Sequence, residues 1–352
     1  MQKQTIAFLY NVRHAYPDAN DPRTQLETDF DDPAVIKFMN QYLKNCGYNL
    51  IPIEANENAY LELYENRENI DLVFNFSEGI YGNDRECQLP AILEMLRLKY
   101  TGSSPLAQAL VLNKAKAKEI LFANNISVLP FQVFENIKEP IKINLPFPII
   151  VKPLSQGSGA GITNKSVVYE KASLFKQAEF VINTFKQPAM IEPFLTGREF
   201  SVAMLGNPPR ILPIIEPDHS LLPEGYLPLD SLEVKWIFEE QTEKHHLVCP
   251  AKIDEKLYEK IKNICLATWD ALEIKDWCRV DLRCDVDNNP YILEVNSPAG
   301  LLPPEISTTS YFPLAARAAG IEYSELLKSI INTAIKRYEN NCLSVIKGLL
   351  VK

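Results

Sequence analysis

The sequence has few features of a membrane, secreted or nucleic-acid-binding protein. No stretch approaches the ~18 consecutive apolar residues that a membrane-spanning helix needs, so we expect no membrane partner. The cysteines number seven, are scattered and form no CxxC pair, which is typical of free thiols in a reducing compartment. We therefore expect a cytoplasmic protein. Because the net charge is −9 and the pI is near 5.2, nucleic acid is also an unfavourable partner.

Two common nucleotide-binding motifs are missing as well. The chain contains neither the P-loop pattern nor the GxGxxG dinucleotide fingerprint. An acidic chain that binds an anionic substrate must meet it with a local cluster of cations. Lysines and arginines that stand beside glycines or carboxylates are therefore the candidate functional residues.

The first part of the chain alternates between predicted strands and helices. Short apolar runs predict strands at residues 5–10, 49–55 and 71–76. Helical spacing over residues 32–46 predicts a helix between the first two strands, and it ends at Gly47, a residue suited to a left-handed cap. This alternation predicts a small parallel sheet that binds ligands at the carboxyl ends of its strands. A helix over residues 110–125 leaves this unit, and we place a boundary near Asn113.

The remaining chain predicts further strands and helices around a long irregular segment. Residues 217–248 are rich in proline, glycine and acidic residues, and such long loops inside compact domains are often functional lids. The neighbouring strands predict a large mixed sheet, which contains a hairpin over residues 277–296. The other predicted elements are strands at 147–153, 189–195, 199–206 and 209–217, helices at 171–185 and 254–272, and a helical C-terminus.

The hairpin carries the strongest chemical pattern. Side chains alternate across a strand, so Arg279 shares a face with Asp281, and Glu294 shares a face with Asn296 on the partner strand. Two carboxylates and an amide are oxygen ligands suited to Mg²⁺. The alternative is an exposed polar face that alternates with a buried set, Val280, Leu282, Ile292, Leu293 and Val295.

A second pattern is a lysine followed by a glycine-rich loop. Lys152 ends a predicted strand, and residues 155–161 read SQGSGAG. Small residues let backbone N–H groups approach phosphate oxygens, and a lysine neutralises the phosphate charge. Alone this pattern is weak, because many glycine-rich turns bind no ligand. Taken one at a time, Lys114, Glu192 and Glu199 would likewise be interpreted as ordinary surface residues.

Together and in this order, these patterns resemble the D-alanine–D-alanine ligase family of ATP-grasp enzymes. The resemblance covers residues 72–327, and the thirteen-residue spacing from Asp281 to Glu294 matches the family pattern. Five segments carry it: NFSEGIYGNDRECQLPAILEMLRLKYTGSSPLAQALVLNK, IIVKPLSQGSGAGI, IEPFLTGREFSVAMLG, RVDLRCDVDNNPYILEVNSPAG and FPLAARAAGIEYSELL.

The resemblance implies an α/β (α+β) ATP-grasp fold in three parts. A substrate-side parallel-sheet domain spans residues 1–113, a small central α+β domain spans 114–195, and a larger mixed-sheet domain with the metal site spans 196–352. ATP would lie between the sheets of the last two domains. A homodimer remains open.

The nucleotide contacts follow from the same resemblance. Lys114 and Lys152 would contact the phosphates, and Lys235 would close over them. Glu199 would bind the ribose hydroxyls. The adenine would be read by Glu192, Phe194 and Leu195.

The resemblance also implies the metal ligands and the catalytic residues. Asp281, Glu294 and Asn296 would hold two Mg²⁺ ions, with Mn²⁺ as an alternative. Arg279 would stabilise the oxyanion when an amine attacks an acyl phosphate. Ser158, the loop serine that pairs with a tyrosine in the family, and Lys235 would be the other catalytic residues. The implied function is a ligase that joins a carboxylate to an amine through an acyl phosphate.

Four departures from the family pattern lie at the two amino-acid subsites. No glutamate follows the first strand, GEDG becomes GNDR at residues 82–85, and the tyrosine that pairs with the loop serine is Trp236. The segment NTSPGMT becomes NSPAGLLPPEI, with a longer loop before Ser310. We therefore expect amino-acid or peptide substrates other than two D-alanines. The alternatives are a genuine D-alanine–D-alanine ligase and a nonenzymatic ATP-binding regulator.

The vacated subsite contains basic residues that suggest one further hypothesis. Arg13, His14 or Arg85 would favour an acyl donor with an extra carboxylate, although a strand-end arginine is as often a surface residue. His245 and His246 are interpreted as solvated loop residues without a role.

Overall fold

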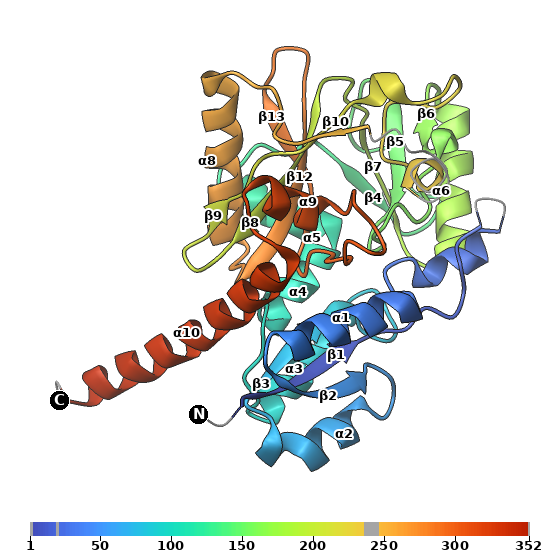
Figure 1. Cartoon of the computed structure of the whole chain (residues 1–352). Helices are drawn as coiled ribbons and strands as arrows, with labels where there is room; N and C mark the ends of the chain where they lie inside the picture. Colours follow the sequence, from blue (N-terminus) through green and yellow to red (C-terminus); the bar gives the residue numbers. More distant parts are fainter. Residues whose placement is uncertain (1–2, 19–20, 236–245, 351–352) are drawn as a thin grey trace.

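A computed structural model describes residues 3–18, 21–235 and 246–350 and arranges them around three main sheets (Figure 1). The N-terminal sheet is parallel, as predicted, and has the order β2-β1-β3. Its strands are β1 (Thr5–Tyr10), β2 (Asn49–Glu54) and β3 (Leu72–Phe76). The central residues of β1 and β3 are buried, because helices cover both faces of a parallel sheet, whereas β2 at the edge has only Ile53 buried.

Helix α1 (Pro33–Asn45) shows why the predicted boundaries of this unit are accurate. The Asp32 side chain accepts a hydrogen bond from the Ala34 N–H and caps the helix, and Pro33 occupies the first turn. Gly47 follows the helix with φ +97°, the left-handed conformation that a glycine tolerates. The unit also contains η1 (Pro22–Glu27), α2 (Ala59–Asn66), η2 (Arg67–Asn69), η3 (Arg85–Cys87) and α3 (Gln88–Met95).

The single helix predicted over residues 110–125 is wrong. The chain forms α4 (Pro105–Leu112) and α5 (Lys114–Ala123), separated at Asn113. Asn113 has an extended backbone, and its side chain accepts a hydrogen bond from the Lys116 N–H, which starts a new helix. The apolar side chains of α5 pack into the core of the C-terminal sheet, so α5 connects the predicted central domain to its neighbour.

The central sheet is antiparallel in the order β4-β7-β5-β6. Helix α6 (Lys171–Phe185) covers one face of it, at the right edge of Figure 1, with Leu174 and Val181 fully buried. The strands are β4 (Gln132–Phe134), β5 (Ile149–Pro153), β6 (Val167–Val168) and β7 (Ala189–Pro193), with η4 (Asn164–Ser166) before β6.

The C-terminal sheet has the order β13-β12-β8-β9, and every ladder in it is antiparallel across the described residues. The mixed character predicted for this sheet is limited, within the described ranges, to one parallel bridge between Val128 and Ile292 of β13. Short turns join β8 to β9 and β12 to β13, and such turns can connect only antiparallel strands. The strands are β8 (Glu199–Leu205), β9 (Arg210–Ile211), β12 (Trp277–Cys284) and β13 (Pro290–Asn296).

The remaining elements surround this sheet. Helix α8 (Glu255–Ala271) begins after Asp254, whose side chain caps it, and packs on the outer face of the sheet. Strands β10 (Glu216–Pro217) and β11 (Leu247–Val248) form a small ladder, with η5 (His219–Leu221) between them. Helices α9 (Tyr311–Ala318) and α10 (Tyr323–Leu350) end the fold, and α10 runs back past the N-terminal sheet (Figure 1). None of the described helices combines the length and apolar character needed to span a membrane.

Candidate functional site

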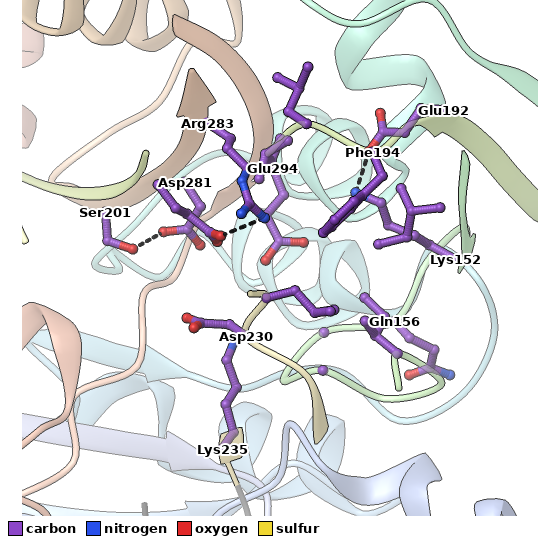
Figure 2. A pocket seen from close by; sticks show the side chains of 18 of the residues that line it. Lys152, Gln156, Glu192, Phe194, Ser201, Asp230, Lys235, Asp281, Arg283 and Glu294 are labelled. Carbon is purple, nitrogen blue, oxygen red and sulfur yellow. Dashed lines mark hydrogen bonds and ion pairs between the residues drawn. The ribbon is translucent and has the colours of Figure 1, made fainter. Parts of the chain in front are cut away.

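A cavity of about 790 Å³, counted with its open mouth, lies between the central and C-terminal sheets. Its walls come from strands β5, β7, β8, β12 and β13 and from the segment before residue 236 (Figure 2). Lys114, Ser158 and Asn296 lie outside the lining. The other predicted site residues all line the cavity: Lys152, Glu192, Phe194, Leu195, Glu199, Lys235, Arg279, Asp281 and Glu294.

The hairpin brings its four polar residues together as the strand alternation predicted. Asp281 lies opposite Glu294 in the ladder, and Arg279 lies opposite Asn296. The Arg279 guanidinium donates to both carboxylate oxygens of Asp281 at 2.8–3.1 Å, and Asn296 Nδ2 donates to Asp281 Oδ2 at 2.9 Å. Arg279, Asp281 and Glu294 line the cavity, so the alternative of a solvent-exposed polar face is wrong.

A β-bulge explains one error in the predicted buried set. The ladder pairs Asp281 with Glu294 and Leu282 with Ile292, which leaves Leu293 as an extra residue. Ile292 is buried, whereas Leu293 is half-buried and lines the cavity. The bulge therefore adds an apolar side chain to a charged wall.

Glu294 is held ionised by the cations around it. Burial by itself would raise the pKa of Glu294, but four nearby cations, led by Lys114 and Lys235, lower this pKa to about 2. Lys114 Nζ lies 3.4 Å from Glu294 Oε2 and donates to the Gln156 carbonyl oxygen at 2.6 Å. Lys114 thus joins the hairpin to the glycine-rich loop.

A buried ion network on the central sheet contains a lysine that the sequence reasoning missed. Glu192 forms ion pairs with Lys152 and with Lys118, whose Nζ lies 2.9 Å from Glu192 Oε2. Lys118 Nζ also donates to the Ile292 carbonyl oxygen at 3.0 Å. Burial alone would raise the pKa of Glu192, but Lys118 and Lys152 lower it. The i,i+4 spacing of Lys114 and Lys118 on one helix was the signal that could have found this residue.

The glycine-rich loop contacts the N-terminal domain. The Gly157 N–H donates to Asp29 Oδ2 at 3.3 Å, and a side chain at position 157 would collide with Asp29. Arg85 donates to the same carboxylate at 2.7 Å and to the Ser155 carbonyl oxygen at 2.9 Å. Arg85 and Asp29 therefore fasten the N-terminal part of the chain to the loop.

The predicted lid is described only in part. Residues 236–245, which include Trp236 and His245, lie outside the described residues, so the replacement of the family tyrosine by Trp236 and the interpretation of His245 stay predictions. The described part of the segment contacts the central domain, because the Leu232 N–H donates to the Ile162 carbonyl oxygen at 2.9 Å. The lid stays a prediction.

Asp230 is a second residue that the sequence reasoning missed. Its Oδ2 accepts a hydrogen bond from Tyr311 Oη at 2.5 Å, and its Oδ1 lies 3.4 Å from His219 Nε2 and 4.0 Å from His246 Nε2. Burial would raise the pKa of Asp230, but the two histidines lower it well below its ordinary value. Arg279 lies over the Tyr311 ring, 5.2 Å from its centroid.

This cluster corrects the interpretation of His246. The residue is 2% exposed, so it is not a solvated loop residue. The side chain lies against Asp230 in the wall of the cavity. No sequence signal marked the cluster, because its members come from separate irregular segments.

The N-terminal sheet edge is tied together by its own polar residues. Asn11 Nδ2 donates to the carbonyl oxygens of Ala55 at 2.9 Å and Gly79 at 3.1 Å. Arg13 Nη2 donates to the Phe30 carbonyl oxygen at 2.5 Å. Arg13 and Arg85, suggested as substrate contacts, thus both have internal partners.

Carboxylates dominate the same edge. Burial raises the pKa of Glu86 to about 8 and the pKa of Asp31 to about 7. Burial and the nearby Glu86 raise the pKa of Glu78 well above its ordinary value. This edge therefore holds protonated or partly protonated acids rather than free cations.

Comparison with known proteins assigns the family. Residues 120–332 match the family model described as the D-ala D-ala ligase C-terminus. The chain is 32% identical to a D-alanine–D-alanine ligase of Pelotomaculum thermopropionicum, over 84% of this chain and 89% of that protein. It is 36% identical to an uncharacterized protein, y4sG, of Sinorhizobium fredii, over 77% of this chain and 76% of that protein.

A solved structure shows the same fold. The D-alanine–D-alanine ligase of Bacillus anthracis complexed with ATP has a TM-score of 0.70 and 24% identity, and the match covers 96% of this chain and 99% of that chain. The family model spans more than half of the chain, and the relatives match most of its length. The chain therefore belongs to the D-alanine–D-alanine ligase family of ATP-grasp enzymes, which are ATP-dependent ligases that form C–N bonds.

Proposed function

We propose that this ligase joins amino acids or small peptides other than two D-alanines, through an acyl-phosphate intermediate. One observation carries the proposal: Asp281 and Glu294 face each other across the hairpin in a cavity that Lys152 and Lys235 also line. Paired carboxylates beside lysines suit a metal-bound polyphosphate.

ATP occupies this cavity in the proposal. Lys114, Lys152 and Lys235 contact its phosphates, and Glu199 accepts hydrogen bonds from the ribose. The strand end that contains Glu192, Phe194 and Leu195 reads the adenine. The Glu192 carboxylate is 0% exposed and pairs with two lysines, so its side chain positions Lys152.

Mg²⁺ fits the hairpin face. Asp281 and Glu294 offer carboxylate oxygens, and Asn296 turns its Nδ2 toward Asp281, which leaves its amide oxygen as a ligand. These residues would hold two ions, with Mn²⁺ as the alternative. When bound, the metal supplies positive charge that offsets the charge of the transferring phosphoryl group.

The reaction then proceeds in two displacements. An oxygen of the substrate carboxylate attacks the γ-phosphorus of ATP, the P–O bond to ADP breaks, and an acyl phosphate forms. The nitrogen of the incoming amine attacks the acyl carbon and loses a proton, and phosphate leaves as the amide forms. Arg279 stabilises the oxyanion between these events, an effect typically worth ~10²–10³ in rate. Ser158 orients the substrate, and Lys235 helps exclude water from the acyl phosphate.

The substrate end supports a change of specificity. At the position where the family has a glutamate, Asn11 and the residues after it tie the domain together. A substrate ammonium group without a counter-charge in a closed, dry site would be unfavourable by several kcal/mol. A penalty of this size prevents productive binding of D-alanine there.

The broader organisation is part of the proposal. We place the domains at residues 1–113, 114–195 and 196–352 and expect a cytoplasmic enzyme, with a homodimer left open. Each of the three main sheets falls within one of these ranges.

One observation favours a second candidate function, D-alanine–D-alanine ligation. Several relatives that are about 30% identical to the chain have this name. A nonenzymatic ATP-binding regulator has less support, because such a protein has no reason to keep Arg279, Asp281, Glu294 and Asn296 together.

A pooled substrate screen tests the proposal. The protein is incubated with ATP, Mg²⁺ and pools of amino acids and dipeptides, and both ADP release and the mass of any amide product are measured. We expect ADP release with at least one pool and a product formed by loss of water from two components. The proposal would be contradicted if, with every pool, the wild-type protein released no more ADP than the Glu294→Gln variant.

A further inference from the structure

The nucleoside end of the cavity contains an arginine that no part of the proposed reaction uses. Arg283 is two residues beyond Asp281 on β12, so it shares the cavity face of that strand. The residue is only 4% exposed, yet it lines the cavity (Figure 2). A buried guanidinium in a ligand cavity needs a set of partners that accounts for its charge.

The partners of Arg283 come from separate segments that meet at the nucleoside end. Nε donates to the Gly197 carbonyl oxygen at 3.1 Å, and Nη2 donates to the Pro228 carbonyl oxygen at 2.7 Å. Nη1 lies 3.3 Å from Glu199 Oε2, and the guanidinium lies over the Phe194 ring, 5.0 Å from its centroid. Arg283 therefore holds the turn at Gly197, the segment around Pro228 and Glu199 in one arrangement.

Glu199 depends on this arginine more than on any other cation. Burial raises the pKa of Glu199, and the neighbouring carboxylates Asp230 and Asp281 raise it further. Arg283 is the strongest opposing influence, followed by His219, whose Nε2 lies 3.9 Å from Glu199 Oε2. Without Arg283, the carboxylate would face two like charges in a buried wall.

We propose that Arg283 is the specificity-determining residue of the nucleoside end, because it holds Glu199 in place as a charged acceptor for the ribose hydroxyl groups. The inference rests on the proposed function, in which ATP binds with its ribose at Glu199. A carboxylate accepts hydrogen bonds from two hydroxyl groups, whereas a protonated acid must donate one itself. Hydrogen bonds to a charged group correspond to about 10- to 100-fold in affinity.

The consequence is discrimination between ribonucleotides and their deoxy analogues. ATP offers two ribose hydroxyl groups to Glu199, whereas 2′-deoxy-ATP and 3′-deoxy-ATP each offer one. The wild-type protein is therefore expected to prefer ATP by about 10-fold over each analogue. When the charge or position of Glu199 is lost, all three nucleotides should bind with similar affinity.

The test measures binding of the three nucleotides by calorimetry in the presence of Mg²⁺, so it needs no amino-acid substrate. Arg283→Met should lower the preference for ATP toward 1-fold, and Arg283→Lys should keep part of the preference. Glu199→Gln should lose as much of the preference as Arg283→Met does. The double variant Arg283→Met/Glu199→Gln should lose no more than either single variant, because the two residues act as one unit. Arg210→Met, at an exposed position of the same sheet, is the matched control and should keep the wild-type preference.

Three outcomes would overturn the inference. One is an Arg283→Met variant with the wild-type preference. Another is an Arg283→Met variant that loses affinity equally for all three nucleotides, since this would indicate a structural role only. The third is a wild-type protein that binds ATP without any preference over its deoxy analogues. If Arg283→Met does not fold, Arg283→Lys decides between these outcomes by the same ratio.

The two proposals fail in different ways. A wild-type protein that binds none of the nucleotides would contradict the proposed function itself. A wild-type protein that prefers ATP, with Glu199→Gln losing the preference and Arg283→Met keeping it, would contradict only the role of Arg283.

Discussion

Carboxylates lie both at the nucleotide end of the proposed active site and at the N-terminal sheet edge, but their surroundings differ. At the nucleotide end, Glu192 and Glu294 each contact a lysine, and their pKa values are lowered. At the N-terminal sheet edge, Glu78 and Glu86 lie close to each other, and their pKa values are raised. The arginine nearest to this pair, Arg85, is committed to Asp29 and to a backbone carbonyl.

The difference shows which end is built for a polyanion. Cations that outnumber their carboxylate partners lower the carboxylate pKa values and leave positive charge for phosphates. Acids that outnumber their cations take up protons instead. The nucleotide end therefore suits the polyphosphate of the proposed function, whereas the charge pattern of the N-terminal edge does not.

The largest expected effect is at the nucleotide end. Glu294→Gln keeps the size of the side chain but removes one of the two carboxylates proposed to hold Mg²⁺ on the hairpin face. We expect ADP release to fall by about 10²–10³, the range for loss of one electrostatic stabiliser of the transition state. The measurement is ADP release with the best substrate pool, and circular dichroism confirms the fold. Turnover like that of the wild type would remove Glu294 from the metal site.

A second variant tests the phosphate contact. Lys152→Ala should weaken ATP binding by about 1–3 kcal/mol, the range for a hydrogen bond to a charged group that is no longer made. Glu192 would still pair with Lys118, so the sheet should remain folded. Lys116→Ala, which removes an exposed lysine of the same charge, is the matched control for calorimetry. Equal affinity in both variants would make Lys152 a structural residue.

A third change concerns the residues between the two ends. Tyr311→Phe removes the hydroxyl that donates to Asp230 but keeps the ring beneath Arg279. We expect the free energy of unfolding to fall by about 0.5–1.5 kcal/mol, with little change in turnover. Tyr311→Leu, which also removes the ring, should lower the rate of ADP release as well.

Chemical denaturation and ADP assays separate these two expectations for Tyr311. Tyr169→Phe, at a position 64% exposed, is the control and should change neither quantity. If Tyr311→Phe lowers turnover as much as Tyr311→Leu, the hydroxyl and not the ring supports Arg279.

The smallest expected effect is the pH dependence at the N-terminal edge. The pKa of Glu86 is raised to about 8 from an ordinary 4.5, so the folded state binds more protons than the unfolded state between these pH values. Stability from this group is complete below about pH 4.5 and is lost as the pH rises through about 8. Glu86→Gln should remove this loss, which we expect to be on the order of 1 kcal/mol after screening by solvent.

Urea unfolding at pH 5.5 and pH 8.5 measures this difference. The Glu86→Gln variant should gain stability relative to the wild type at the higher pH. Glu119→Gln, which changes an exposed glutamate, is the control and should follow the wild type. Parallel curves for the wild type and Glu86→Gln would mean that the charge contrast between the two ends is absent in solution.

Local patterns predicted most of the elements and half of the site. The helices predicted from Asp32 and Asp254 begin one residue later in the structure, and the predicted hairpin brings Asp281 and Glu294 into one patch. The same alternation extends from Arg279 through Asp281 to Arg283, so Arg283 was within reach of the method that found the others. The error at Leu293 arose because a bulge interrupts alternation without any sign in composition.

The rest depended on contacts between distant segments. Asp230, His219 and His246 meet only because the segment after β9 folds against the cavity wall, and no periodicity links irregular residues. Asn113 divided a helical pattern because its side chain caps α5, a choice that local propensity alone does not decide. Tertiary context likewise decided that His246 is buried.

The central claim is that the nucleotide end is retained while the substrate end has changed. The most direct test compares ADP release with D-alanine alone against release with acidic amino acids and short peptides at equal concentration, with ATP and Mg²⁺ present. The account predicts little release with D-alanine and substantial release with at least one other substrate. Robust turnover with D-alanine alone, with D-alanyl-D-alanine as the product, would contradict it.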